Sequence, residues 1–445
     1  MSEKIQYAGE VNIDALEILT SSGLKVDVTE ITVSVDIFED IFKNTITGSI
    51  ILGDTENILT NFKIVGQELL RLKFRTPGLT EKQDILDFTD NPFFIYKINM
   101  RESVTSGGQM YELLFATQES LRNQTVRVSK SYKDSIQNIV YDLMENENII
   151  ATKKDVYVDA TLGSRKIVAP NVHPYSLIDK LKRESISMVD GSTEFLFFEN
   201  KDGFYFTSLS GLYSAPIKAI FHDGDKALDE NLSSTKDRVD NTVIQSFRRI
   251  INYDIVSNKD FSMNLMGGMM GGELTTHNIY NKSYETTNYS YFDNFRDHPR
   301  IEGSNSKTIY SDALLSDLNT FDKTSIKVHP TSSVNDLDAQ HYEGGNTVYS
   351  TNRAKDWMLH RQSRISELNN NSFINMTVHG ITNLKVGDII EANFPVVGND
   401  HNNYKLDPFL SGIYLISKLR HTFSPITKSH QINIQIVRDC GTIDI

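Results

Sequence analysis

The glycine-rich stretch GGMMGG, Gly267 to Gly272, has the composition of a phosphate-binding loop. A P-loop also needs a lysine and a serine or threonine directly after its last glycine, followed by a helix, because the lysine and the backbone amides hold the phosphates. Neither feature follows Gly272. The sequence instead favours a flexible hairpin tip or a partner-contact loop. The methionines around it suit an adaptable contact surface: Met263, Met266, Met269 and Met270.

The 11 histidines show no metal-binding pattern. They are scattered singly, without the close pairs that zinc sites use, so we expect no metal site and no cofactor. His379 and His421 fall on predicted strands, where a structural role is the ordinary interpretation. The nucleophile elbow Gly-x-Ser-x-Gly is also missing. Paired carboxylates of the glycosidase type stay open, since such partners meet only in space, but no catalytic residue can be named.

The stretch LKVGDIIEANFP, Leu384 to Pro395, could be either a phosphate or metal loop or a turn that leads into a strand. Gly387 would supply a positive φ, and Asp388 would accept hydrogen bonds from nearby amides. No residue around them would hold a phosphate. The stretch therefore predicts a corner of a β-barrel.

Composition limits the possible functions. The chain has 445 residues, enough for about two to four domains. Its net charge of −13 disfavours tight binding to nucleic acid or to anionic membranes. The single cysteine, Cys440, excludes an internal disulfide framework. The charged N-terminus is unlike a signal peptide, and the sequence has no apolar run long enough to span a membrane. We therefore expect a protein that folds in a cytoplasm.

Residues 1–118 alternate apolar and polar side chains, which is typical of half-buried strands. The alternation slips near Thr29 and Glu30, as a bulge or bend would cause. About six strands and a short helix ending near Gly66 predict a first small β-barrel.

Residues 119–212 have a helical period and predict an α/β domain. Ser131 is the expected cap of one helix, and Pro174 stands near the start of a second. Aromatic strands around Lys201-Asp202-Gly203 predict a hairpin.

Residues 213–262 and 351–445 predict a second, discontinuous barrel. A helix precedes its last strands, with Trp357 and Arg361 on the expected inner stripe. Residues 263–350 predict an inserted loop-rich region. The expected fold class is α+β, mainly β, with two similar antiparallel β-barrels, an α/β domain between them and an irregular insertion.

The C-terminal barrel resembles the final barrel of the central baseplate hub proteins of contractile-tailed, T-even-like bacteriophages, which are related to the hub domains of type VI secretion spike proteins. In that family a strand ends in glycine, a Gly-Asp turn and a Gly-x-Tyr-x-Ile strand follow, and a His and a final Arg complete the pattern. The N-terminal stretch GSIILGDTENIL, Gly48 to Leu59, is similar to the first barrel of these hubs. The matching C-terminal positions are Gly380, Gly387, Asp388, Gly412, Tyr414, Ile416, His421 and Arg438.

The resemblance implies a structural protein of the virion, in the tail baseplate, that assembles in the host cytoplasm and is not an enzyme. Two similar barrels per chain in a homotrimer would give a pseudo-sixfold ring, able to join a hexameric tail tube to a trimeric spike. The implied partners are other copies of the chain, a spike protein, a tube or tube-initiator protein and further baseplate proteins. DNA would pass through the ring without specific binding, and the chain would not enter a membrane.

Two alternatives stay open at the level of sequence. One is a virion-associated glycan hydrolase or receptor-binding tail-tip protein. Such hydrolases usually have a groove of Trp and carboxylate side chains, whereas this chain has one Trp. The other alternative is the equivalent hub of a bacterial contractile injection system.

Overall fold

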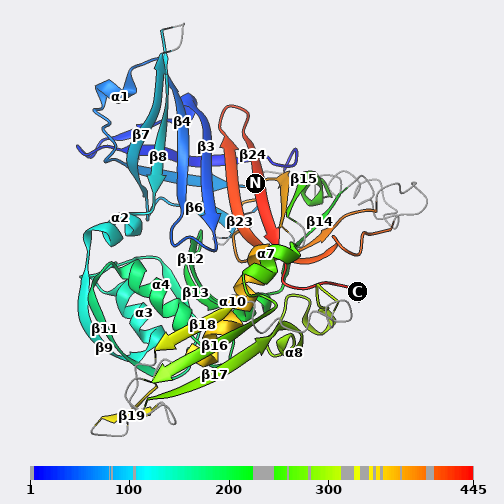
Figure 1. The fold of residues 1–445 in the computed structure, drawn as a ribbon. Coiled ribbons are helices and arrows are strands. Elements are labelled where there is room, and N and C mark those ends of the chain that lie inside the picture. Colours follow the sequence, from blue (N-terminus) through cyan, green and yellow to red (C-terminus); the bar gives the residue numbers. More distant parts are fainter. Residues whose placement is uncertain are drawn as a thin grey trace.

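The structure is a computed structural model. It describes residues 5–79, 81, 84–103, 107–223, 245–257, 260–278, 282–311, 325–330, 340–343, 347–350, 354–370, 373–396 and 405–443. Strands predominate over helices (Figure 1), and the predicted class, α+β and mainly β, is confirmed. No helix in these residues is long and apolar enough to cross a membrane.

The N-terminal unit is an antiparallel sheet around one apolar core. Its alternating residues explain this arrangement, because one side of each strand faces the core and the other faces solvent. The predicted slip of phase lies at a short 3-10 turn, Thr29–Ile31, between two strands. The elements are β1 (Asn12–Leu19), β2 (Lys25–Asp27), β3 (Thr32–Asp40), β4 (Thr47–Asp54), α1 (Ile58–Asn61), β5 (Leu69–Arg75), β6 (Ile85–Asp87), β7 (Phe93–Ser103) and β8 (Gln109–Ala116).

The middle unit packs two helices against two small sheets. The prediction that Ser131 caps the helix was wrong, because Ser131 pairs with Val168 in a sheet. Ser135 caps the helix instead, accepting a hydrogen bond from the amide of Asn138 at 3.4 Å. The elements are α2 (Gln118–Thr125), β9 (Val128–Ser135), α3 (Ile136–Glu145), β10 (Asp155–Val158), β11 (Ser164–Val172), α4 (Pro174–Glu184), β12 (Phe195–Asn200), β13 (Gly203–Ser208) and α5 (Leu209–Tyr213).

The C-terminal unit continues the sheet of the N-terminal unit. Fourteen of the described strands form one sheet, with the order β15-β21-β24-β23-β3-β4-β8-β7-β5-β1-β2 along its main path. The expected pair of similar antiparallel β-barrels is not confirmed: within the described strands, the two units share one open sheet. The new elements are β14 (Ile217–His222), β15 (Ile250–Ser257), β21 (Phe373–His379), β22 (Ile389–Asn393), β23 (Gly412–Ser424) and β24 (Ser429–Val437).

The length of β23 is the physical reason for the shared sheet. The strand has 13 residues, twice what a small barrel needs from one strand. Its first part, from Gly412 to Leu415, pairs with β22. After an irregularity at Ser417, the part from Lys418 to Phe423 pairs with β3. One strand thereby serves both units.

The glycine- and methionine-rich stretch is not the loop that its composition suggested. It forms the end of α7, a turn and the start of β16, and both Met269 and Met270 are buried. Helix α10 packs over both methionines. Its Ser363 hydroxyl donates a hydrogen bond to the carbonyl of Met269 at 2.7 Å. The elements here are α7 (Phe261–Met266), β16 (Gly271–Asn278), β17 (Ser283–Ser290), α8 (Tyr291–Asn294), η3 (Gly303–Asn305), β18 (Ile326–Pro330), β19 (Gln340–Glu343), β20 (Thr347–Ser350) and α10 (Ala354–Asn370).

The C-terminal hairpin β23–β24 lies against the N-terminal unit (Figure 1) and completes its core. The ring of Phe423, from β23, stacks on Phe74 of β5 with centroids 4.0 Å apart. The chain just before β1 also contacts this hairpin, since the His430 amide donates to the carbonyl of Gly9 at 2.7 Å. The N-terminal core is therefore incomplete without residues from the end of the chain.

Replacement of Phe423 by alanine tests this dependence. We expect the variant to lose about 3–5 kcal/mol of unfolding free energy, because a fully buried aromatic ring leaves a cavity. Phe409→Ala is the matched control, since Phe409 is 49% exposed and should cost less than about 1 kcal/mol. Urea denaturation of both variants measures the difference, and equal midpoints would show that β23 does not support the N-terminal core.

Candidate functional site

Strand β12 lies at the junction of the three units. Its residues form a continuous apolar run, which is typical of a strand buried on both faces. Phe195 and Phe197 belong to the core of the middle unit, whereas Leu196 and Phe198 belong to the core of the C-terminal unit. Both cores therefore share one strand, and its polar ends are positioned to bind the rest of the molecule.

Glu199, at the end of β12, binds the N-terminal unit. Its carboxylate accepts hydrogen bonds from the Ile46 amide at 3.0 Å and the Thr117 hydroxyl at 2.9 Å. Lys154 of the middle unit donates to the other carboxylate oxygen at 2.5 Å. Burial raises the pKa of Glu199 to about 7. Both carboxyl oxygens of Glu199 therefore have donors. The group joins the end of β12 to the residue just before β4 and to the residue just after β8.

Glu39, on β3, joins all three units. One oxygen accepts a hydrogen bond from the amide of Lys201, in the turn after β12, at 3.0 Å. The other accepts from the amide of Val386, in the C-terminal unit, at 3.0 Å. The side chain is 1% exposed, and burial raises its pKa to about 8. A single carboxyl group thus fixes a strand and two turns from separate parts of the chain.

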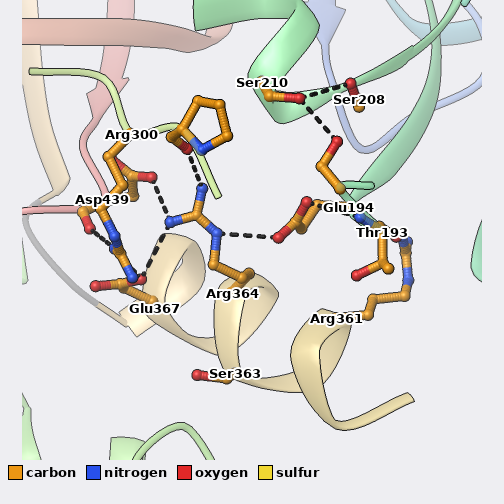
Figure 2. A network of polar contacts seen from close by, with 12 residues as sticks. Thr193, Glu194, Ser208, Ser210, Arg300, Arg361, Ser363, Arg364, Glu367 and Asp439 are labelled. Carbon is orange, nitrogen blue, oxygen red and sulfur yellow. Dashed lines mark hydrogen bonds and ion pairs between the residues drawn. The ribbon is translucent and has the colours of Figure 1, made fainter. Parts of the chain in front are cut away.

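A buried ion network holds α10 against the middle unit (Figure 2). Arg364 lies between Glu194, just before β12, at 3.0 Å and Asp439, just after β24, at 2.8 Å. Arg300 pairs with Glu367 at 2.6 Å. The buried side of α10 therefore combines the polar residues Ser363, Arg364 and Glu367 with apolar residues such as Leu359 and Leu368. The burial of these residues is possible because each charge has an opposite charge beside it.

The sequence-predicted motif residues fall into three places. Gly387 has a φ of +89° in a turn where Asp388 accepts a hydrogen bond from the Lys385 amide at 3.1 Å, and the backbone of Ile416 pairs with this turn. Gly380 lies directly on the ring of His430, which contacts His421. Gly412, Tyr414 and Arg438 meet at the other end of β23, where the Arg438 guanidinium lies 5.0 Å from the Tyr414 ring.

The structure brings together residues that the sequence did not single out. They come from three separate segments: Glu39 lies on β3, Glu194 and Glu199 stand at the two ends of β12, and Arg364 lies on α10. Their signal in the sequence is weak: each glutamate stands next to an apolar run, and Arg364 lies in a polar stretch with no such run beside it. In the part of the chain that the structure describes, no group of three or more His, Cys, Asp or Glu side chains is arranged to hold a metal ion. The junction is built to hold parts together.

A polar groove of about 600 Å³ crosses the outer face of the shared sheet at its centre. It spans β15, β21, β24, β23, β3 and the start of β4, and its amide side chains bind one another, as in the Gln435 to Asn375 bond of 3.1 Å. Its charges are balanced between strands. Arg420 makes two hydrogen bonds to Asp36, at 3.0 and 2.9 Å, and Lys418 stands opposite Asp40.

Comparison with known proteins places this architecture among phage tail proteins. The chain is 20% identical to the probable baseplate hub protein gp334 of Vibrio phage KVP40, over 85% of the chain and 84% of that protein. No known family model matches the chain.

Two solved structures share the fold. One is the tail protein from Neisseria meningitidis MC58, with 10% identity, a TM-score of 0.53 and 96% coverage of both chains. The other is the 43 kDa tail protein of prophage MuSo2 from Shewanella oneidensis, with 8% identity, a TM-score of 0.51, and 96% and 99% coverage.

Substitution at the ion network tests its structural role. Arg364→Met removes one guanidinium and leaves Glu194 and Asp439 buried without it, which should cost about 3–5 kcal/mol of unfolding free energy. Lys355→Met, on the same helix, removes an exposed pair with Glu285 and should change stability by less than about 0.5 kcal/mol. Thermal and urea unfolding measure both. An Arg364→Met variant with the unfolding free energy of the wild type would show that the network does not hold α10.

The match to a probable baseplate hub over most of both chains and the shared tail-protein fold confirm the resemblance seen in the sequence, and support a structural role for this chain in a phage tail baseplate hub.

Proposed function

We propose that this chain forms the trimeric ring of a phage tail baseplate hub, which joins a hexameric tail tube to a trimeric spike and leaves a channel for DNA. The observation that carries the proposal is the extent of the match to a probable baseplate hub protein, which covers 85% of this chain and 84% of that protein rather than one motif. That relative is a phage protein, which favours a virion tail over a bacterial injection machine.

The shared sheet suits a role in a ring. It joins the N- and C-terminal units into one rigid wall, because each interior strand is paired on both sides. We assign its polar groove to the wall of the channel. Amides and hydroxyls line much of it, Arg420 is paired with Asp36, and Lys418 stands opposite Asp40, so the wall would have little excess positive charge and DNA could slide past it without tight binding.

The edge strand β15 is our candidate for contact between copies. It is the last strand on this side of the sheet within the described residues, and an open edge favours pairing with another strand. It also carries exposed apolar side chains, among them Ile251 at 44% and Ile255 at 43%. Pairing of this edge with a neighbouring copy would cover them and extend the wall around the ring.

The role of such a hub is binding, so we propose that the chain has no catalytic activity of its own. Its partners would be a tube or tube-initiator protein on one side of the ring, a spike protein on the other, and further baseplate proteins around it. The hub would assemble in the host cytoplasm and reside in the virion tail.

Native mass spectrometry tests the ring. We expect a trimer for the wild-type chain, with and without spike protein. The double substitution Ile251→Lys and Ile255→Lys should yield a folded monomer, because it places charges at the contact edge. Ile326→Lys, at a residue that is 61% exposed outside the shared sheet, is the control and should stay trimeric. A wild-type chain that stays monomeric with spike present, or an edge variant that still forms trimers, would contradict this assignment.

Reconstitution tests the function as a whole. We expect the purified chain to retain a tube protein and a spike protein together, with binding that weakens only modestly between low and physiological salt, since shape rather than charge should carry it. We also expect no hydrolysis of peptidoglycan or polysaccharide. Failure to retain either protein, combined with glycosidase activity lost on changing one carboxylate, would favour the hydrolase alternative.

A further inference from the structure

A layer of polar side chains separates the N-terminal core from the core of the C-terminal unit. This layer, which we name the seam, consists of Glu39, Lys201, His421 and His430. On the inner face of the sheet, His421 stands beside Ile37 and Phe423 of the N-terminal core, while Leu419 next to Glu39 belongs to the other core. The seam therefore lies where β3 and β23 join the two units.

The two histidines of the seam are bound to each other. Nδ1 of His421 and Nε2 of His430 are 3.0 Å apart, and both side chains are fully buried. The outer nitrogen of each ring, Nε2 of His421 and Nδ1 of His430, is buried without a hydrogen-bond partner. The ring of Phe423 covers His430, with centroids 4.1 Å apart. The pair is thus suited only to neutral imidazoles.

Protonation would act directly on this contact. One added proton leaves a buried charge with an N–H group that has no acceptor. A second places two N–H donors against each other, which removes the hydrogen bond between the rings. Both changes disappear when β23 leaves β3 and the rings reach water.

We propose that the His421–His430 pair is an acid-sensitive latch: when the pair takes up protons, β3 separates from β23 and the N-terminal unit comes away from the rest of the chain with the other cores still folded.

The groups around the pair define its pH dependence. Lys201, from the turn after β12, adds a positive charge on the His421 side, and Glu39 is the carboxyl group of β3 in the seam. His379, on β21, is half-buried, and burial together with Arg249 lowers its pKa. Arg420 and Asp36 lie on the outer face and pair with each other. Burial lowers the pKa of His421 to about 3 and that of His430 well below its ordinary value, whereas burial raises the pKa of Glu39 to about 8.

These shifts have opposite signs. Histidines with lowered pKa values stabilise the closed seam above their ordinary pKa, and this stabilisation is lost as the pH falls through the range below about 6.5. Glu39, with its raised pKa, stabilises the closed seam at low pH and loses this effect as the pH rises toward 8. Between about pH 6.5 and 4.5, opening takes up two protons on the imidazoles and releases one from Glu39. The net uptake of one proton should increase the opening constant about tenfold per pH unit of acidification.

Hydrogen exchange of the full-length chain between pH 6.5 and 4.5 tests the latch. After correction for the intrinsic exchange rate, amides of β3 and of the Lys418–Phe423 part of β23 should lose protection about tenfold per pH unit, while those of α3 should not. The double variant His421→Asn and His430→Gln keeps polar atoms at the positions of Nδ1 and Nε2 but cannot titrate. Its pH dependence should reverse in sign, because only Glu39 remains. His277→Gln, at an exposed histidine, should behave as the wild type.

A second variant covers the case in which the double variant does not fold. Glu39→Gln removes the opposing titration, so its loss of protection should steepen to about a hundredfold per pH unit. Equal protection of the wild-type strands at pH 6.5 and 4.5 would overturn the proposal. Opening of α3 together with β3, or an unchanged slope in either variant, would overturn it as well.

Discussion

The pairing of β3 with β23 is the interaction on which the rest of the structure depends. It joins segments almost 400 positions apart, as in the contact of Asp36 with Arg420, which are separated by 384 residues. Closing so long a loop costs entropy, and the pairing opposes that cost with ladder hydrogen bonds, a two-bond ion pair and the stacking of Phe423 on Phe74. Because of this pairing, the N-terminal core contains a residue from the end of the chain.

The middle unit is joined to the others by the shared strand β12 and by buried polar contacts rather than by a continued sheet. Glu199, Glu194 and Glu39 each cross a boundary between units, and each is saturated with donors. Replacing a buried ion pair by apolar side chains often leaves stability unchanged or improved. What these polar contacts add at the junction is geometry: an apolar contact tolerates sliding, whereas a carboxyl group between two fixed amides has one position. Such fixed geometry would suit the hub proposed above, which would match a tube and a spike of different symmetry.

The balance of charges also bears on the passage of DNA. The whole chain carries a net charge of −13, yet the groove on the shared sheet combines amides and hydroxyls with cations that are matched by acids on neighbouring strands. Overall acidity repels phosphates at long range, whereas a locally neutral wall avoids both attraction and strong repulsion at contact. The channel wall proposed above would need this second property, and it is visible only when strands from both units lie side by side.

The sequence by itself determined the local features. A period of two fixed which side of each strand is buried, helical stripes located α3 and α4, and the Gly387–Asp388 pair indicated a turn with a positive φ. These features depend on neighbours within a few residues. Tertiary structure alone decided that β23 serves two units, that Met269 lies in a core and that Arg364 on α10 is buried. The physical reason is that a strand edge, a methionine or an arginine can be either exposed or buried, and the outcome depends on a partner that only the folded chain brings to it.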